Sequence, residues 1–111
     1  GIVTRVALRL DPVAGASATA LVGVPDAASA QRIVRHFLSQ TGTRLTAAEI
    51  LWRRFAALMQ RGLGYAPGQL PLDAPCLLVL GLGADSIEAA RTALEDGLAA
   101  IWVEAGIVDA L

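Results

Sequence analysis

The sequence of 111 residues has no lysine, a single cysteine and a single histidine. Cys76 has no partner within the sequence, so neither an internal disulfide nor a cysteine-based metal site is expected. Nine arginines against ten acidic residues give a net charge of −1, which excludes the positive surplus that a non-specific nucleic-acid binder needs. No apolar run approaches the roughly 18 residues of a membrane span, and no signal peptide is visible. These absences favour a cytoplasmic protein without a nucleic-acid partner or a membrane span.

Apolar residues are abundant instead. Hydrophobic residues make up 55% of the chain and charged residues only 17%, against about 45–50% and about 25% in ordinary soluble domains. The length suits a single domain, and the composition excludes intrinsic disorder because there is ample apolar surface to bury. A soluble chain this apolar typically covers one of its faces with a partner. We therefore expect an apolar face that contacts something outside this chain.

The first third of the sequence contains two strand patterns and a helix pattern. Alternation of apolar and other residues predicts a strand over residues 2–10, which ends at residues 11–12. Small and β-branched residues predict a second strand over 18–24. Asp26 lies where a helix N-cap belongs, and apolar residues then recur at helical spacing over residues 26–41. A strand–strand–helix order is predicted for this part of the chain.

Residues 44–61 are ambiguous. Thr46 and Glu49 have the spacing of a capping box, so local rules predict one helix over residues 47–61. The clustered glycines and prolines of residues 62–75 exclude regular structure there. A loop of this length in a compact domain is either functional or covers a face of the protein.

The last third predicts a strand, a helix and a strand. The apolar run at residues 76–83 is typical of a strand that is buried on both faces. Asp85 is the expected N-cap of a helix that extends to about Ala105, with Arg91 and Glu95 as an exposed ion pair one turn apart. Gly106 ends this helix, and residues 107–111 predict a last strand.

Residues with obvious chemistry are scattered. His36 lies on the polar side of the first helix with no acid or nucleophile at helical spacing, so it is interpreted as a solvated residue. Gly81 and Gly83 lack the third glycine of a dinucleotide-binding fingerprint because Ser86 takes its place, which favours a plain tight turn between strand and helix. A small basic group is consistent with either an anion site or a solvated helix face. It consists of Arg53, Arg54 and Arg61. We predict no catalytic, cofactor-binding or metal-ligating residue in this chain.

Three segments carry a family resemblance: GIVT with the strand that follows it, AEIL around Glu49, and EAGIVDA near the C-terminus. In this order they resemble the cap segment of FAD-linked oxidases of the vanillyl-alcohol oxidase type. The relatives they resemble most are the glycolate oxidase FAD subunit and the D-lactate and D-2-hydroxyglutarate dehydrogenases. The resemblance spans nearly the whole chain and rests on pattern and order rather than on an invariant motif.

The resemblance implies an α+β fold. We expect a ferredoxin-like βαβ–βαβ unit, with helices packed on one face of an antiparallel sheet, plus the N-terminal strand. The single helix that local rules predict at 47–61 is replaced by a strand over 44–51 and a helix over 52–61. Residues 1–12 then lead from an absent FAD-binding domain, and residues 13–111 form the cap unit, as an apparently excised fragment.

The resemblance also implies a function. The parent protein is expected to oxidise a 2-hydroxy acid of the glycolate, D-lactate or D-2-hydroxyglutarate class, with FAD held by an FAD-binding domain of the same chain. The fragment itself would be inert, would bind no FAD alone, and would cover the flavin with an apolar sheet face. Left uncovered, that face would let the fragment self-associate.

Few individual residues follow from the resemblance. Glu49, Trp52 and Tyr65 are candidate residues lining the flavin or the substrate. Relatives bind a metal with histidines and an acid, and the carboxylate of the hydroxy acid with an arginine. No position of this sequence matches these residues, so the sequence does not decide whether the parent protein binds a metal elsewhere. The alternative is a free-standing ferredoxin-like domain that dimerises and acts in regulation or ligand binding.

Overall fold

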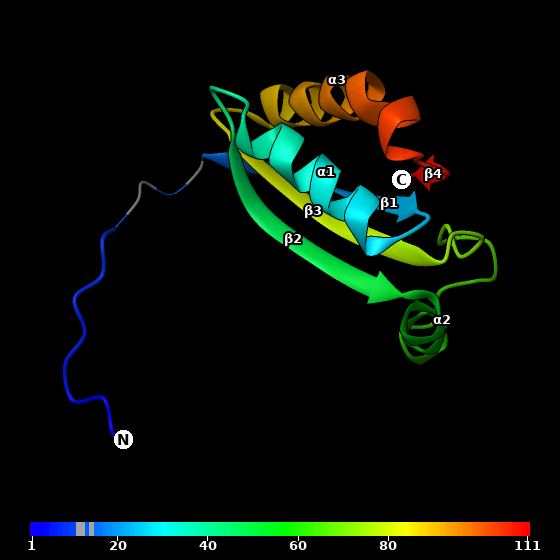
Figure 1. Cartoon of the computed structure of the whole chain (residues 1–111), viewed down its shortest axis with the longest axis horizontal. Helices are drawn as coiled ribbons and strands as arrows, with labels where there is room; N and C mark the ends of the chain where they lie inside the picture. The colour runs from blue at the N-terminus through cyan, green and yellow to red at the C-terminus, as the bar shows by residue number, and fades with distance from the viewer. Residues whose placement is uncertain (11–12, 14) are drawn as a thin grey trace.

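The structure is a computed structural model that describes residues 1–10, 13 and 15–111. Its elements are β1 (Ala16–Val24), α1 (Ala27–Leu38), β2 (Arg44–Trp52), α2 (Arg53–Gly62), β3 (Cys76–Ala84), α3 (Ile87–Ala105) and β4 (Asp109–Ala110). In the described part of the chain the strands form one antiparallel sheet in the order β2-β3-β1-β4 (Figure 1). This order, with α1 and α3 as the connecting helices, is the ferredoxin-like arrangement, so the predicted α+β fold is confirmed.

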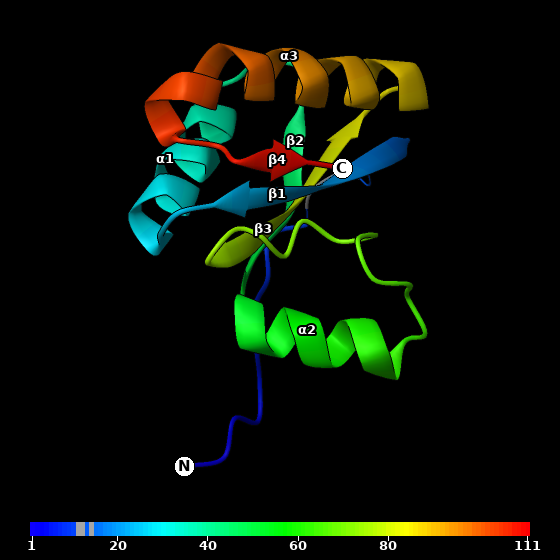
Figure 2. The same ribbon diagram turned by 90° about the vertical axis from the view of Figure 1, so that its right-hand side faces the viewer.

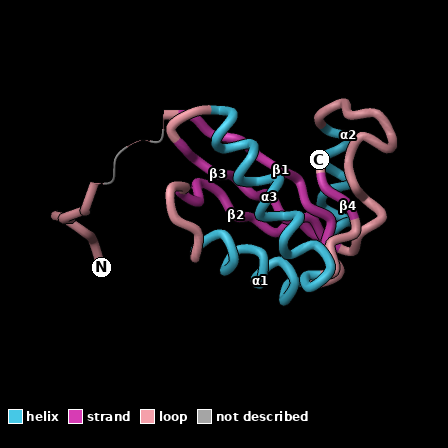
Figure 3. Tube along the Cα trace, turned by 90° about the horizontal axis from the view of Figure 1, so that it is seen from above, coloured by secondary structure: helices cyan, strands magenta, loops and turns pink. Residues whose placement is uncertain are grey.

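The sheet has helices on both faces. α1 and α3 lie side by side over one face, while α2 lies against the other face near the end of β2 (Figures 2 and 3). The predicted packing of helices on one face is therefore right for α1 and α3 and wrong for α2. The reason is local: α2 follows the edge strand directly and buries only a narrow stripe, Ala56 and Gln60.

β3 is the central strand and confirms the prediction of a strand buried on both faces. Alternate residues of β3 point to opposite faces because the side-chain period of a strand is two. Leu78, Leu80 and Leu82 contribute to the core beneath α1 and α3, together with Ile33 and Phe37 of α1. The residues between them face the side of α2.

The ambiguous segment is a strand followed by a helix. β2 pairs with β3 from Arg44 to Trp52, so the local prediction of one helix over 47–61 is wrong for its first part. A full ladder of backbone hydrogen bonds to β3 outweighs the weak local preference of a capping box. The strand at 44–51 and the helix at 52–61 that the resemblance implied are confirmed to within one residue.

The strand predicted over residues 2–10 is not formed in this structure. Residues 1–10 are exposed, lie outside any helix or strand, and lead away from the sheet (Figure 1). Alternation makes a segment suitable for a strand, but a strand exists only where a neighbouring strand accepts its hydrogen bonds. The end of this strand, predicted at residues 11–12, lies outside the described residues.

The helix ends differ slightly from the prediction. α1 ends earlier than expected, at Leu38. The N-cap of α3 is Ser86 rather than Asp85, because the Ser86 hydroxyl accepts the backbone N–H of Ala89 at 3.1 Å. Gly106 follows α3 with φ 64°, in the left-handed conformation predicted for it.

Asp26 is the N-cap of α1, as predicted, and its carboxylate accepts the N–H of Ser29 at 2.7 Å. This hydrogen bond lowers the pKa of Asp26 below its ordinary value of 3.8. A group whose pKa is lower in the folded state stabilises the fold above its unfolded pKa, and loses this effect as the pH falls through its folded pKa.

Asp26→Ala is therefore expected to lower the free energy of unfolding at pH 7, by an amount that shrinks as the pH falls below about 4. Urea unfolding at pH 7, 5 and 3 measures the difference. Asp26→Asn is the control, because it keeps a hydrogen-bond acceptor without the charge. A difference from the wild type that stays constant between pH 7 and pH 3 would contradict this role of the carboxylate.

Candidate functional site

The face of the sheet opposite α1 and α3 is divided into two halves. α2 and the loop over residues 63–75 cover the half formed by the end of β2 and the start of β3 (Figure 2). The other half, which no described helix or loop covers and which is here called the uncovered half, carries mostly small side chains. Its members, placed by strand register, are Ser17, Thr19, Arg44, Ala47 and Glu49. The predicted apolar contact face is thus only partly exposed, and its exposed part carries small side chains rather than large apolar ones.

The covered half contains a small satellite core. A cavity of about 170 Å³ lies between the sheet and the segments that cover it. It is lined by Leu21, Leu51, Ala56, Met59, Leu63, Tyr65, Leu70, Leu77 and Val79. The long loop predicted over residues 62–75 therefore covers a face of the sheet, which was one of the two roles expected of it.

The three candidate lining residues are not brought together. Glu49 lies on the uncovered half, opposite Val79 of β3, and is exposed. Tyr65 lines the cavity on the same side of the sheet and is half exposed. Trp52 lies opposite Cys76, a core residue, and so occupies a position on the α1 and α3 side of the sheet, 59% exposed. The strand predicted from the sequence ends at residue 51 and leaves Trp52 to the helix that follows, so that prediction does not use the odd spacing that puts Glu49 and Trp52 on opposite faces of β2.

Arg44 is a residue of this face that the sequence analysis did not select. It lies opposite Gly83 in the register, just before the bulge between Leu45 and Ala47. A guanidinium group suits the recognition of carboxylates. The resemblance placed Arg44 at the start of the predicted strand, but no motif in the sequence singled this residue out.

Gly81 serves close packing and not a phosphate-binding turn. It lies inside β3, which continues to Ala84, so the tight turn predicted at Gly81 and Gly83 begins later than expected. A Cβ at Gly81 would stand 2.7 Å from the Thr46 hydroxyl oxygen and 3.1 Å from the Cβ of Ala47. Glycine is required here because the bulge of β2 crowds the central strand.

Cys76 and His36 show no features of reactive groups. Cys76 is fully buried, its thiol donates to the Val24 carbonyl at 3.5 Å, and burial raises its pKa. This confirms the prediction of a small buried residue. His36 is half-buried and lies 3.1 Å from the side-chain amide nitrogen of Gln40. Among the residues that the structure describes, no group of three His, Cys, Asp or Glu side chains could hold a metal ion.

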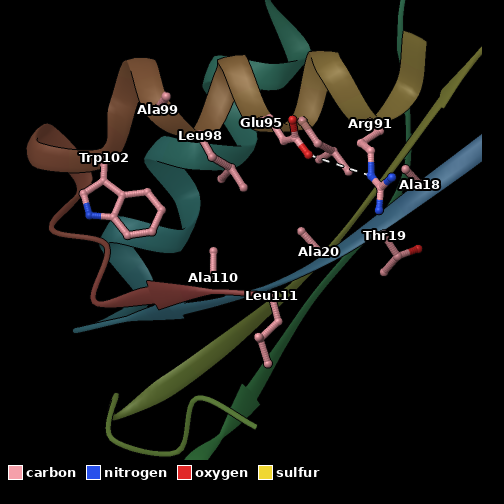
Figure 4. A pocket seen from close by; sticks show the side chains of 11 residues that line it. Ala18, Thr19, Ala20, Arg91, Glu95, Leu98, Ala99, Trp102, Ala110 and Leu111 are labelled. Atoms are coloured by element: carbon pink, nitrogen blue, oxygen red, sulfur yellow. Dashed lines mark ion pairs between the residues drawn. The ribbon is translucent and has the colours of Figure 1, made fainter. Parts of the chain in front are cut away.

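A groove of about 420 Å³ lies between α3 and the edge of the sheet formed by β1 and β4 (Figure 4). Its floor and wall are mainly apolar, with Leu98 and Trp102 from α3, and the predicted ion pair of Arg91 and Glu95 lies at its rim with an N–O distance of 3.8 Å. β4 is shorter than the strand predicted over 107–111 because the N–H of Ile107 bonds back to α3.

The sequence matches the family described as FAD linked oxidases, C-terminal domain, over residues 14–111. No curated protein and no solved structure matches the chain significantly. Within the described ranges, no helix combines the length and the apolar character needed to cross a membrane. The family match extends over every strand and helix described above. The chain therefore belongs to the FAD-linked oxidase family, and residues 14–111 lie within its C-terminal domain.

Proposed function

We propose that this chain is part of the cap of an FAD-dependent oxidoreductase and that the uncovered half lies over the flavin ring. The observation that supports this placement is the small size of the side chains there. Ser17, Thr19 and Ala47 surround Gly81, which has no side chain at all. Such a surface lets a flat ring approach the sheet closely, and family membership supplies the flavin.

The chain fits the flavin ring and not the FAD phosphates. Phosphate sites are built from glycine-rich turns and free helix N-termini. Gly81 and Gly83 lie within β3, and the N-termini of α1 and α3 are capped by Asp26 and Ser86 of this chain. The first N–H of α2 donates to the carbonyl of Pro75. FAD would accordingly be held by an FAD-binding domain elsewhere in the parent chain.

We further propose a 2-hydroxy acid as the substrate of the parent protein. The support is the resemblance to hydroxy-acid dehydrogenases, together with the presence of one carboxylate and one guanidinium, Glu49 and Arg44, on the uncovered half. Bound FAD would accept the electrons that the hydroxyl-bearing carbon loses. The role proposed for the residues of this chain is to enclose the substrate and to exclude water from it.

Thr19→Trp in the flavoprotein that contains this chain is expected to lower kcat/KM by at least about tenfold, because a large ring would separate the cap from the flavin. The same variant should shift the flavin absorption bands, which report the surroundings of the ring. Val103→Ser on the outer side of α3, where Val103 is 92% exposed, is the control and should change neither quantity. The 111-residue chain alone, titrated with FAD, should show no tight binding. Unchanged kcat/KM and flavin spectrum in Thr19→Trp, or stoichiometric FAD binding by the chain alone, would contradict the proposal.

A free-standing ligand-binding domain is the second candidate. The groove between α3 and the β1–β4 edge is the observation that favours it, because its apolar walls and polar rim resemble a small-molecule site (Figure 4). The family match over residues 14–111 favours the cap instead.

A further inference from the structure

β2 is an edge strand of the sheet, and from Ala47 to Trp52 none of the described residues pairs with its outer side. Leu21 exchanges hydrogen bonds with Leu111 on the β4 side of β1, and backbone groups of successive residues in an antiparallel strand point alternately to the two sides. Following this alternation through β1 and β3 to β2, Glu49 bonds toward β3, while Ala48 and Ile50 direct their N–H and C=O groups away from the sheet. The edge is therefore ready to accept another strand.

An apolar groove lies directly above this edge. It measures about 500 Å³ and runs between α1 and β2 on the side of the sheet that α1 covers. Alanine dominates its lining, which consists of Ala27, Ala28, Ala30, Gln31, Val34, Ala48, Ile50 and Leu78. On the same side, Ile50 and Trp52 are 40% and 59% exposed. The β2 edge thus has two complementary features. One is a groove formed mainly by small residues, and the other is the large exposed indole of Trp52 on the same strand.

We propose that a second copy of this chain binds the β2 edge, so that the two β2 strands run antiparallel about a two-fold axis and each Trp52 enters the alanine-lined groove of the other copy. With Ile50 opposite Ile50 of the second copy, Trp52 lies opposite Ala48, which lines the groove. Both side chains are on the side of α1, because they differ from Ile50 by an even number of residues. A two-fold contact of this kind makes every interaction twice.

Charge complementarity supports this register. Glu49 then lies opposite Leu51 of the second copy, and its two diagonal neighbours are Arg53, where α2 of that copy begins, and Glu49 of that copy. The two-fold axis gives two diagonal Glu49–Arg53 pairs against one diagonal Glu49–Glu49 pair, and α2 contains no acidic residue. Within the described ranges, neither Glu49 nor Arg53 has an ion pair in its own chain. A register shifted by one residue pair would set Glu49 against Glu49, and directly opposed like charges are destabilising. The bulge between Leu45 and Ala47 confines the pairing to the second half of β2.

The contact is expected to be moderate in strength. Two buried indoles contribute about 150–250 Å² each, and five paired residues a strand leave the total near or below the roughly 1,600 Å² of a standard interface. Buried area does not convert directly into affinity. For a contact at the small end of the stable range we expect a dissociation constant in the micromolar range. The contact uses the strand edge and the α1 side of the sheet, together with Glu49, which also lies on the uncovered half. Substitutions of Trp52 and Ala48 therefore test the dimer alone, whereas substitutions of Glu49 bear on the dimer and on the proposed cap function.

Sedimentation equilibrium of the 111-residue chain between about 1 and 500 µM tests the proposal. The wild type should dimerise in the micromolar range. Trp52→Ala should raise the dissociation constant at least tenfold, and Ala48→Pro should do so as well, because it removes an N–H that points away from β3 and leaves the internal ladder intact. Circular dichroism and thermal unfolding verify that both variants fold. Val103→Ala, the removal of an exposed apolar side chain far from the edge, should leave the constant unchanged.

Exchanging the charges of Glu49 and Arg53 tests whether the dimer forms at this edge or at another surface. Glu49→Arg should weaken the dimer, and Glu49→Arg combined with Arg53→Glu should restore it, since the diagonal pair is re-formed with opposite signs. A chain that is monomeric at about 500 µM would overturn the proposal. So would a dimer that is indifferent to Trp52→Ala and Ala48→Pro and is broken instead by Thr19→Lys, which would place the contact on the uncovered half.

Discussion

Gly97→Leu is expected to destabilise the fold by about 3 kcal/mol or more. Gly97 lies in the middle of α3, where the ring of Phe37 from α1 packs against its backbone, and a Cβ there would stand 2.5 Å from a ring carbon. Helix propensity predicts the opposite sign, because glycine costs a helix interior about 1 kcal/mol relative to alanine. Packing decides the outcome, since Phe37 is only 2% exposed and its ring belongs to the close-packed core. Urea unfolding followed by circular dichroism measures the change.

A double-mutant cycle isolates this contact. Phe37→Ala alone should cost about 3–5 kcal/mol, as expected for a buried phenylalanine. When the two substitutions are combined, the leucine at position 97 can occupy the space of the lost ring, so the double variant should be more stable than the sum of the single effects predicts, by about 1–2 kcal/mol. Strictly additive effects would show that the two helices do not meet through these residues.

Gly81→Val is the second substitution with a large expected effect, a loss of about 2–4 kcal/mol. The new side chain would collide with the hydroxyl of Thr46 and the backbone N of Ala47, at 2.7 and 3.2 Å from its Cβ. Because backbone cannot move aside as a side-chain tip can, β2 would have to separate from the central strand. Chemical unfolding gives the loss in stability, and amide hydrogen exchange along β2 locates it.

Two further variants verify the cause. Gly81→Ala in a Thr46→Ala background removes the closest contact and should lose clearly less stability than Gly81→Ala alone. Gly62→Ala is the matched glycine control, because a Cβ there meets nothing within 4 Å. If Gly62→Ala and Gly81→Val cost the same, crowding at the bulge is not the reason for the glycine in β3.

The family match covers the sheet and its helices. Cys76 is buried with a raised pKa, and His36 lies beside the side-chain amide of Gln40. The cap function proposed above assigns the chemistry to a cofactor that another domain of the parent protein would hold.

The sequence by itself determined the elements whose pattern is local. α1 and α3 followed from apolar residues at helical spacing and from their caps. β3 followed from an apolar run that is typical of a strand buried on both faces. These elements can be predicted from their own residues, because periodicity, capping and turn residues act within a few positions along the chain. The family resemblance added the strand that local rules had assigned to a helix.

Only the tertiary structure decided the features that depend on a neighbour. Pairing with β3 made residues 44–52 a strand, and the parity of that strand then placed Glu49 and Trp52 on opposite faces. Residues 2–10 have an equally good strand pattern and form no strand, because no strand in the described part of the chain pairs with them. Backbone pairing and close packing depend on residues that are distant in sequence. The sequence alone therefore does not determine whether a segment forms a strand or which face a side chain takes. The need for glycine at positions 81 and 97 likewise follows only from the residues that pack against them.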